Sequence, residues 1–248
     1  MTTLDQTSRP RAQSREWKAI VILILLIPVL WSPILLFRSF LFQPFNIPSG
    51  SMSPTLIVGD NVLAAKYAYG WGRYSFPYAP SFISGRFGAV DPDYGDIVVF
   101  AAPKGPPTYY VKRLVGLPGD RVQMREGQLF LNDRPVTRAA LKDVPAAAAC
   151  GGEPGATAKR WRETMPNGAS YVTYDCVDRG YVDNTAVFTV PSGHFFAMGD
   201  NRDNSTDSRF MSAMGFIPLD NLVGKVTRIY WSLDSRGGLR PDRVGKVW

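Results

Sequence analysis

Hydrophobic positions follow two different patterns along the 248-residue chain. Between Ala19 and Phe37 they form one run of 19 residues without a charge, AIVILILLIPVLWSPILLF. From Ser39 onward they occur in short runs rich in β-branched and aromatic residues, separated by Gly, Pro, Asn and Asp. The first pattern predicts one apolar helix. The second predicts a mostly β domain, because no long amphipathic helical pattern follows Phe37.

The short runs predict strands at residues 61–65, 96–100, 109–115, 121–124, 129–132, 171–175, 186–190 and 226–233. Two stretches interrupt them. Residues 68–93 are rich in Tyr, Phe, Gly and Pro and predict a long aromatic loop. This loop is either a packed surface excursion or a contact with a lipid interface through Trp71, Tyr74, Phe76 and Tyr78. Residues 135–179 contain both cysteines and predict an inserted, smaller subdomain.

The apolar run is long enough to cross a bilayer, which takes roughly 20 residues. A cleavable signal peptide has a shorter apolar core and an Ala-x-Ala site, and the sequence RSFLFQPFNIPSG after the run offers none. A buried helix of a soluble protein would carry polar positions. Pro28 and Pro33 are compatible with a transmembrane helix, which tolerates proline. We therefore predict an uncleaved anchor at residues 19–37.

Charges beside the anchor predict its orientation. The basic residues that precede it are Arg9, Arg11, Arg15 and Lys18. They outnumber Asp5 and Glu16, and only Arg38 follows closely. The positive-inside rule then places residues 1–18 in the cytoplasm, as a short disordered tail, and residues 38–248 outside, as the main domain.

The net charge of +7 and a pI near 9.5 favour an anionic partner. Nucleic acid is not predicted, because no base-reading module can be traced in the sequence. Anionic membrane lipid agrees better with the anchor. Cys150 and Cys176 are too few and too widely spaced for a zinc motif. In an external compartment such a pair often forms a disulfide, which we predict here, whereas in the cytosol it would be incidental.

Several kinds of catalytic site lack the residues they need. His194 is the single histidine and lies among apolar residues, so it favours a structural role over a place in a Ser-His-Asp triad or a zinc site. The run DNRDNSTDSR resembles a calcium loop in composition, but Ser205 stands where a Gly is needed and Met211 where a bidentate Glu is needed. We predict no metal and no organic cofactor.

Three segments carry the candidate chemistry. In FNIPSGSMSPTL, residues 45–56, prolines and a glycine form a rigid turn that can fix a serine hydroxyl beside backbone N–H groups. In YYVKRLVGLPGD, residues 109–120, strand alternation places Lys112 on one face with Tyr110 and Leu114, and desolvation there favours the neutral amine. GDNRDNSTDSR, residues 199–209, predicts a polar turn network. Each segment alone also fits a solvated loop or strand edge.

Together these motifs resemble the bacterial type I signal peptidases, the leader peptidase family of Ser-Lys dyad serine proteases. PSGSMSPTL, YGDIVVF, YVKRLVGLPGD and GDNRDNSTDSR occur in the family's order, followed by GFIP and NLVGKV. The likeness runs from Arg38 to about Trp231, apart from the aromatic loop and the cysteine-bearing insert. The resemblance implies a mostly antiparallel β catalytic domain with a smaller inserted β subdomain, preceded by one transmembrane helix.

The resemblance also implies a role for each matching residue. Ser51 would be the nucleophile and Lys112 its general base. Ser49 would supply an oxyanion-hole hydroxyl, Ser205 would hydrogen-bond the lysine, and Asp207 and Arg209 would form a supporting ion pair. The residues expected to line the substrate cleft are Phe45, Ile47, Met52, Val99, Tyr110 and Val111.

Two features depart from the family pattern. FMSAM between Arg209 and Gly215 is longer than the link in many relatives, and some relatives carry two anchors. The expected function is a membrane-bound endopeptidase on the external face of a bacterial inner membrane, which removes signal peptides from secretory preproteins after small residues. Two alternatives remain. One is a Ser-Lys peptidase dedicated to a conjugation or pilus precursor, and the other is a non-catalytic, membrane-anchored scaffold.

Overall fold

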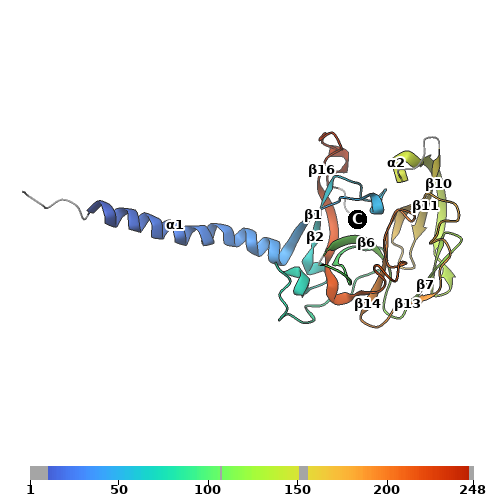
Figure 1. The fold of residues 1–248 in the computed structure, drawn as a ribbon, viewed down its shortest axis with the longest axis horizontal. Helices are drawn as coiled ribbons and strands as arrows, with labels where there is room; N and C mark the ends of the chain where they lie inside the picture. The colour runs from blue at the N-terminus through green and yellow to red at the C-terminus, as the bar shows by residue number, and fades with distance from the viewer. Residues whose placement is uncertain (1–10, 107, 151–155, 246–248) are drawn as a thin grey trace, which may run out of the picture.

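The computed structural model describes residues 11–106, 108–150 and 156–245. Helix α1 (Arg11–Leu36) continues into the π-helical turn η1 (Phe37–Leu41) and extends away from the β domain (Figure 1). An 18-residue window within Trp17–Leu41 has a mean hydropathy of 2.9, and none of this window is buried against the rest of the protein. By length and composition this helix can cross a membrane, as the predicted anchor at residues 19–37 requires.

The predicted disordered tail is wrong for residues 11–18, which are helical. A helix that is already nucleated by a long apolar segment gains one backbone hydrogen bond for each further residue, so RAQSREWK extends it at little cost. The remainder of that predicted tail, residues 1–10, lies outside the described residues.

A seven-stranded antiparallel sheet forms the main body, in the order β1-β2-β16-β5-β6-β14-β15. Its strands are β1 (Phe42–Asn46), β2 (Asp60–Ala65), β5 (Ile97–Ala101), β6 (Tyr109–Gly116), β14 (His194–Met198), β15 (Ile217–Pro218) and β16 (Leu222–Ser232). Every residue of β5 is buried, because one face packs with Ile47 and Met52 and the other with Leu114 and Phe195. A strand covered on both faces explains the unbroken apolar run IVVFA.

Two smaller antiparallel sheets pack beside the large one. The first, β13-β7-β8-β9, consists of β13 (Phe188–Thr189), β7 (Arg121–Arg125), β8 (Gln128–Leu131) and β9 (Arg134–Pro135). The second, β10-β11-β12, consists of β10 (Thr137–Pro145), β11 (Thr157–Thr164) and β12 (Ser170–Asp175). A shared core joins Leu129 and Tyr171 to Phe196 and Met198 of the large sheet. The segment predicted as an insert, residues 135–179, contains the second sheet and the short helix α2 (Ala146–Cys150).

The aromatic loop contains a two-stranded ribbon, β3 (Trp71–Gly72) and β4 (Arg86–Phe87), and the short turns η3 (Lys66–Ala68) and η4 (Arg73–Ser75). Part of the loop packs against the end of the apolar helix. Trp71 Nε1 donates a 2.8 Å hydrogen bond to the Phe40 carbonyl oxygen, and the rings of Trp71 and Phe76 both lie edge-on to Phe40. Tyr78, by contrast, is fully exposed. The remaining short turns are η2 (Gly50–Met52), η5 (Leu219–Asn221) and η6 (Pro241–Arg243).

Candidate active site

Ser51 lies in the 3₁₀ turn η2, directly after strand β1 and between Pro48 and Pro54. Two backbone hydrogen bonds fix the approach to this turn, because Ile47 N donates to the Asp60 carbonyl and Gly59 N donates to the Ile47 carbonyl. The Ser51 carbonyl oxygen accepts a 3.1 Å hydrogen bond from Asn201 N. Only 9% of the serine is exposed. The proline-flanked segment therefore forms the rigid turn that the sequence predicts.

Lys112 projects from β6 onto the same serine. Its Nζ lies 2.6 Å from Ser51 Oγ, and the residue is 4% exposed. Burial lowers the Lys112 pKa from 10.5 to about 8, against the opposing pull of the Asp207 and Asp200 carboxylates. At a pH near 8 about half of the amines are neutral, and a neutral amine at hydrogen-bond distance can accept the serine proton.

Ser49 stands beside the nucleophile, with its Oγ 3.3 Å from Ser51 Oγ. The hydroxyl can therefore donate toward the same reacting centre. This position fits the predicted oxyanion-hole hydroxyl, which would act together with the Ser51 backbone N–H.

The predicted ion pair of Asp207 and Arg209 is present and fully buried. Arg209 Nε donates to Asp207 Oδ1 at 2.9 Å and Arg209 Nη2 to Oδ2 at 2.8 Å, and Gly199 N donates to the same carboxylate at 3.0 Å. Burial alone would raise the Asp207 pKa, but the Arg209 charge and these hydrogen bonds outweigh it, and the pKa is lowered. Asp207 thus stays ionised near Lys112 and is held in one orientation.

Ser205 corrects one predicted contact. Its hydroxyl makes no hydrogen bond of standard geometry within the part of the chain that is described, so the expected bond to Lys112 is absent. The side chain packs against Gly199, where an added Cβ would collide with the Ser205 hydroxyl and would lie 2.5 Å from the Ser51 carbonyl oxygen. From there the hydroxyl faces Asp207 and helps to lower its pKa.

A cleft of about 240 Å³ opens beside Ser51 and Lys112. Five of the predicted cleft residues line it: Phe45, Ile47, Met52, Tyr110 and Val111. Val99 does not. It is fully buried on β5 beside Val111, its partner on β6, and it packs into the core cluster that contains Ile47 and Met52. Tyr109 was missed and lines the cleft with its ring 5.6 Å from that of Phe45.

Two buried ion pairs near the site were also missed. Arg113 donates through Nε and Nη2 to both carboxylate oxygens of Asp200, each at 2.7 Å. Arg202 donates through Nη1 and Nη2 to both carboxylate oxygens of Glu163, at 2.8 and 2.5 Å. The sequence held a signal for the first pair, since strand alternation points Arg113 away from Lys112 and toward the opposite face. Glu163 lies in the predicted insert, and no local pattern connects it to the GDNRD turn.

Comparison with known proteins identifies the family. A family model for signal peptidase, peptidase S26, matches residues 14–231. The chain belongs to this family. Signal peptidase I of Rickettsia typhi is 38% identical over 207 residues, which are 80% of this chain and 75% of that protein. Signal peptidase I of Rickettsia canadensis is 34% identical over 236 residues, 92% of this chain and 83% of that protein.

A crystal structure of a signal peptidase I from Enterococcus faecalis V583 is 26% identical and covers 56% of this chain and 98% of that chain, at a TM-score of 0.32. That structural similarity is too low to bear on the fold. Membership of the signal peptidase family makes the chain a serine endopeptidase of the signal-peptide-removing class. The predicted family and enzyme class are therefore confirmed.

The lone histidine of this signal peptidase family member lies apart from the Ser51–Lys112 pair. His194 begins β14, opposite Pro218, and its Nδ1 is 3.0 Å from the Ser192 carbonyl oxygen. Within residues 11–106, 108–150 and 156–245, no hydrogen bond joins His194 to Ser51 or Lys112. Its contacts agree with the structural role that the sequence favours.

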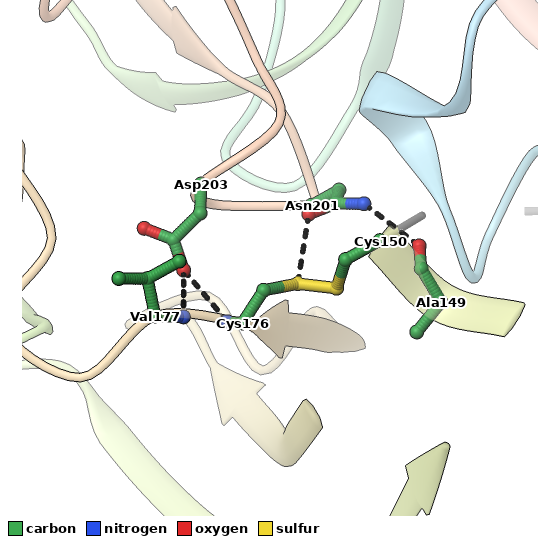
Figure 2. Close-up of a disulfide and its surroundings, with 6 residues drawn as sticks. All are labelled: Ala149, Cys150, Cys176, Val177, Asn201 and Asp203. Carbon is green, nitrogen blue, oxygen red and sulfur yellow. Dashed lines mark hydrogen bonds between the residues drawn. A yellow bond between two sulfur atoms is a disulfide. The ribbon is translucent and has the colours of Figure 1, made fainter. Parts of the chain in front are cut away.

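The predicted disulfide between Cys150 and Cys176 is formed, with 6.3 Å between the two Cα atoms. It joins the end of α2 to the chain just after β12. Figure 2 shows that Asn201 and Asp203, from the GDNRDNSTDSR turn, lie directly against it. Asp203 Oδ2 accepts hydrogen bonds from Cys176 N at 2.6 Å and Val177 N at 3.0 Å. The disulfide and the catalytic turn are thus neighbours.

Proposed function

We propose that this chain is a membrane-anchored signal peptidase in which Ser51 is the nucleophile and Lys112 the general base. The single observation that carries the proposal is the 2.6 Å separation of Lys112 Nζ and Ser51 Oγ in a buried setting that lowers the lysine pKa to about 8. A base must lie within hydrogen-bond reach of the proton it abstracts and have a pKa near the working pH, and Lys112 meets both conditions.

The reaction follows from this geometry. Neutral Lys112 takes the proton from Ser51 Oγ as the oxygen bonds to the scissile carbonyl carbon, and the resulting oxyanion faces the Ser51 N–H and the Ser49 hydroxyl. The Lys112 ammonium then protonates the leaving amine, the peptide C–N bond breaks, and an acyl-enzyme remains. Lys112 next deprotonates a water molecule, whose attack releases the signal peptide and restores Ser51.

The cleft supports an extended substrate with small side chains next to the cut. A peptide can lie beside β1 and β6 as an added strand, with alternate side chains directed into the protein. The cleft of about 240 Å³ is lined by packed apolar side chains, including Ile47, Met52 and Val111. Small side chains at the first and third positions before the cut are what the resemblance to the signal peptidase family implies. A larger residue would displace packed neighbours at a cost of about 1–3 kcal/mol.

The anchor supports cleavage at the surface of a bacterial inner membrane, on its external side. Phe45 follows Leu41, the end of the apolar helical segment, by four residues. In an extended strand this distance is roughly 13 Å, so the cleft starts close to the point where the chain leaves the membrane. Basic residues before the helix favour a cytoplasmic N-terminus, and secretory preproteins emerging on the other side would be the substrates.

A model preprotein with Ala at the first and third positions before the cut tests the proposal. The wild-type chain in detergent should cleave it, and Ser51→Ala should reduce cleavage to background. Replacing either Ala by Leu or Phe should lower the rate about ten- to two-hundredfold. Equal cleavage of all three preproteins would refute the proposed specificity. If the wild-type chain cleaves no ordinary preprotein, a peptidase dedicated to one precursor is favoured. If it binds preproteins without cutting them, a non-catalytic scaffold is favoured.

A further inference from the structure

Asn201 connects the nucleophile to the disulfide. The residue is fully buried, and its backbone N–H donates a 3.1 Å hydrogen bond to the Ser51 carbonyl oxygen. Its side chain points the other way. Nδ2 donates to the Ala149 carbonyl oxygen at 3.0 Å, and Oδ1 lies 3.4 Å from Cys176 Sγ (Figure 2). A single asparagine therefore spans from the Ser51 turn to both sides of the Cys150–Cys176 bridge.

One side of this bridge is firmly held without the disulfide. Tyr174, near the end of β12, pairs with Asn201, because Tyr174 N donates to the Asp200 carbonyl and Arg202 N donates to the Tyr174 carbonyl, each at 2.9 Å. Asp203 also binds the backbone N–H groups of Cys176 and Val177. Several hydrogen bonds to backbone groups thus attach the Cys176 side to the GDNRDNSTDSR turn.

The Cys150 side has much weaker support. Helix α2 has five residues, fewer than an isolated helix needs. Among the described residues, its support is the Ala146 N–H bond to the Ala156 carbonyl and a small buried cluster around Ala146, Ala149 and Ala158. The disulfide is the covalent link that fixes its end next to the catalytic turn. Without it, the Ala149 carbonyl that receives the Asn201 side chain would no longer be held at a fixed distance from Cys176.

We propose that Asn201 is a positioning residue for Ser51 and that the Cys150–Cys176 disulfide fixes the far end of this connection. The inference rests on the proposed function in one respect, the role of Ser51 as nucleophile. The Asn201 side chain is fixed by its hydrogen bond to the Ala149 carbonyl. Its backbone N–H then holds the Ser51 carbonyl, so that the η2 turn keeps Ser51 Oγ within hydrogen-bond distance of Lys112 Nζ. A displacement of the nucleophile of about 1 Å costs on the order of a hundredfold in rate, so loosening this connection lowers kcat.

Asn201→Ala removes the side-chain contacts and should lower kcat about ten- to hundredfold. KM should stay unchanged, because Asn201 is not among the residues that line the cleft. Asn201→Asp is nearly the same size and removes the donor to Ala149, so it serves if the alanine variant folds poorly. An unchanged kcat in the variant that folds would overturn the proposal.

Asn221→Ala is the matched control. Asn221 is also buried and donates through Nδ2 to a backbone carbonyl, that of Ala101, at 2.9 Å, but no hydrogen bond of the described residues joins it to Ser51. It should lower the melting temperature and leave kcat unchanged at temperatures well below melting. A kcat loss equal to that of Asn201→Ala would mean that both changes act through stability, which would overturn the positioning role.

The disulfide is tested in the full-length protein by the double variant Cys150→Ser/Cys176→Ser and by a dithiol reagent. The dithiol supplies two electrons and two protons, the S–S bond breaks to two thiols, and the reagent becomes a cyclic disulfide. Both treatments should lower kcat by less than Asn201→Ala does, and the dithiol should leave the double variant unchanged. Combined with Asn201→Ala, the cysteine changes should cause no further loss, because both act through one connection.

Equal kcat of the oxidised and reduced enzymes, or fully additive losses in the combined variant, would overturn the inference. Neither result would bear on the proposed function, which is tested separately by preprotein cleavage with the Ser51→Ala and Lys112→Ala variants.

Discussion

At the scale of single residues, the proposed mechanism depends on one lysine that is kept out of water. Lys112 sits beside two carboxylates that favour its charged form, yet burial outweighs them and lowers its pKa to about 8. The Asp207 charge is already engaged by Arg209, which limits its pull on the lysine. The site thus combines a lysine of lowered pKa with a buried ion pair beside it.

This pKa sets the pH dependence of the reaction. Only neutral Lys112 can take the Ser51 proton, so kcat/KM should rise with pH through a value near 8 and then level off. The measurement is the rate of preprotein cleavage between pH 6 and pH 10 at constant ionic strength. A midpoint near 6.5, the ordinary histidine value, that vanished in His194→Ala would contradict the account.

Residue roles were predictable where a motif fixes both type and spacing. Ser51, Lys112, Asp207 and Arg209 come together as the motifs predict, from η2, β6 and the turn after β14. The motifs did not predict that Val99 lies outside the cleft or that the Ser205 hydroxyl makes no hydrogen bond to Lys112. The depth of a side chain in a curled sheet and the rotation of one hydroxyl depend on packing partners that are distant in sequence.

At the scale of elements, several strands with continuous or alternating apolar positions were predictable, whereas strands with exposed charges were not. β14 (His194–Met198) is an exception, because it was missed although its last four residues are buried. β5 and β6 lie within a residue or two of their predicted bounds. β10 (TRAALKDVP) and β11 (TAKRWRET) were missed. β10 is largely exposed and β11 is rich in charged residues, and the two form a sheet only by pairing with each other and with β12. Such pairing is a long-range property.

The buried pair of Glu163 and Arg202 fastens β11 to the catalytic turn. Glu163→Ala leaves a buried guanidinium without its partner and should cost about 3–5 kcal/mol of unfolding free energy. Urea denaturation of the variant measures this loss. In the control Glu163→Met/Arg202→Met no charge stays buried, so most of the stability should return. A loss below about 1 kcal/mol for Glu163→Ala would contradict a structural role for the pair.

At the scale of the whole molecule, the aromatic loop fastens the β domain to the end of the apolar helix. Lys66 is buried and its Nζ donates to the Arg38 carbonyl at 2.8 Å and also to the Ser75 carbonyl, beside the Trp71–Phe40 hydrogen bond. This arrangement keeps the start of β1, and with it the cleft, near the end of the apolar helical segment.

The proposed orientation can be checked by protease protection in right-side-out vesicles that contain the full-length chain with an N-terminal epitope. Protease added outside should digest the β domain and leave the epitope intact, because the basic residues before α1 favour the cytoplasmic side. Lysed vesicles are the control, in which the epitope should also be lost. Loss of the epitope in sealed vesicles would refute the orientation.

The measurement that tests the Ser-Lys mechanism most directly is the rate of preprotein cleavage by Lys112→Ala and His194→Ala, compared with the wild-type chain. Loss of the general base should lower kcat by at least about 10²- to 10⁴-fold, with the variant still folded. His194→Ala should cleave at the wild-type rate, since its ring contacts only the Ser192 carbonyl among the hydrogen bonds described. An active Lys112→Ala together with an inactive His194→Ala would contradict the mechanism.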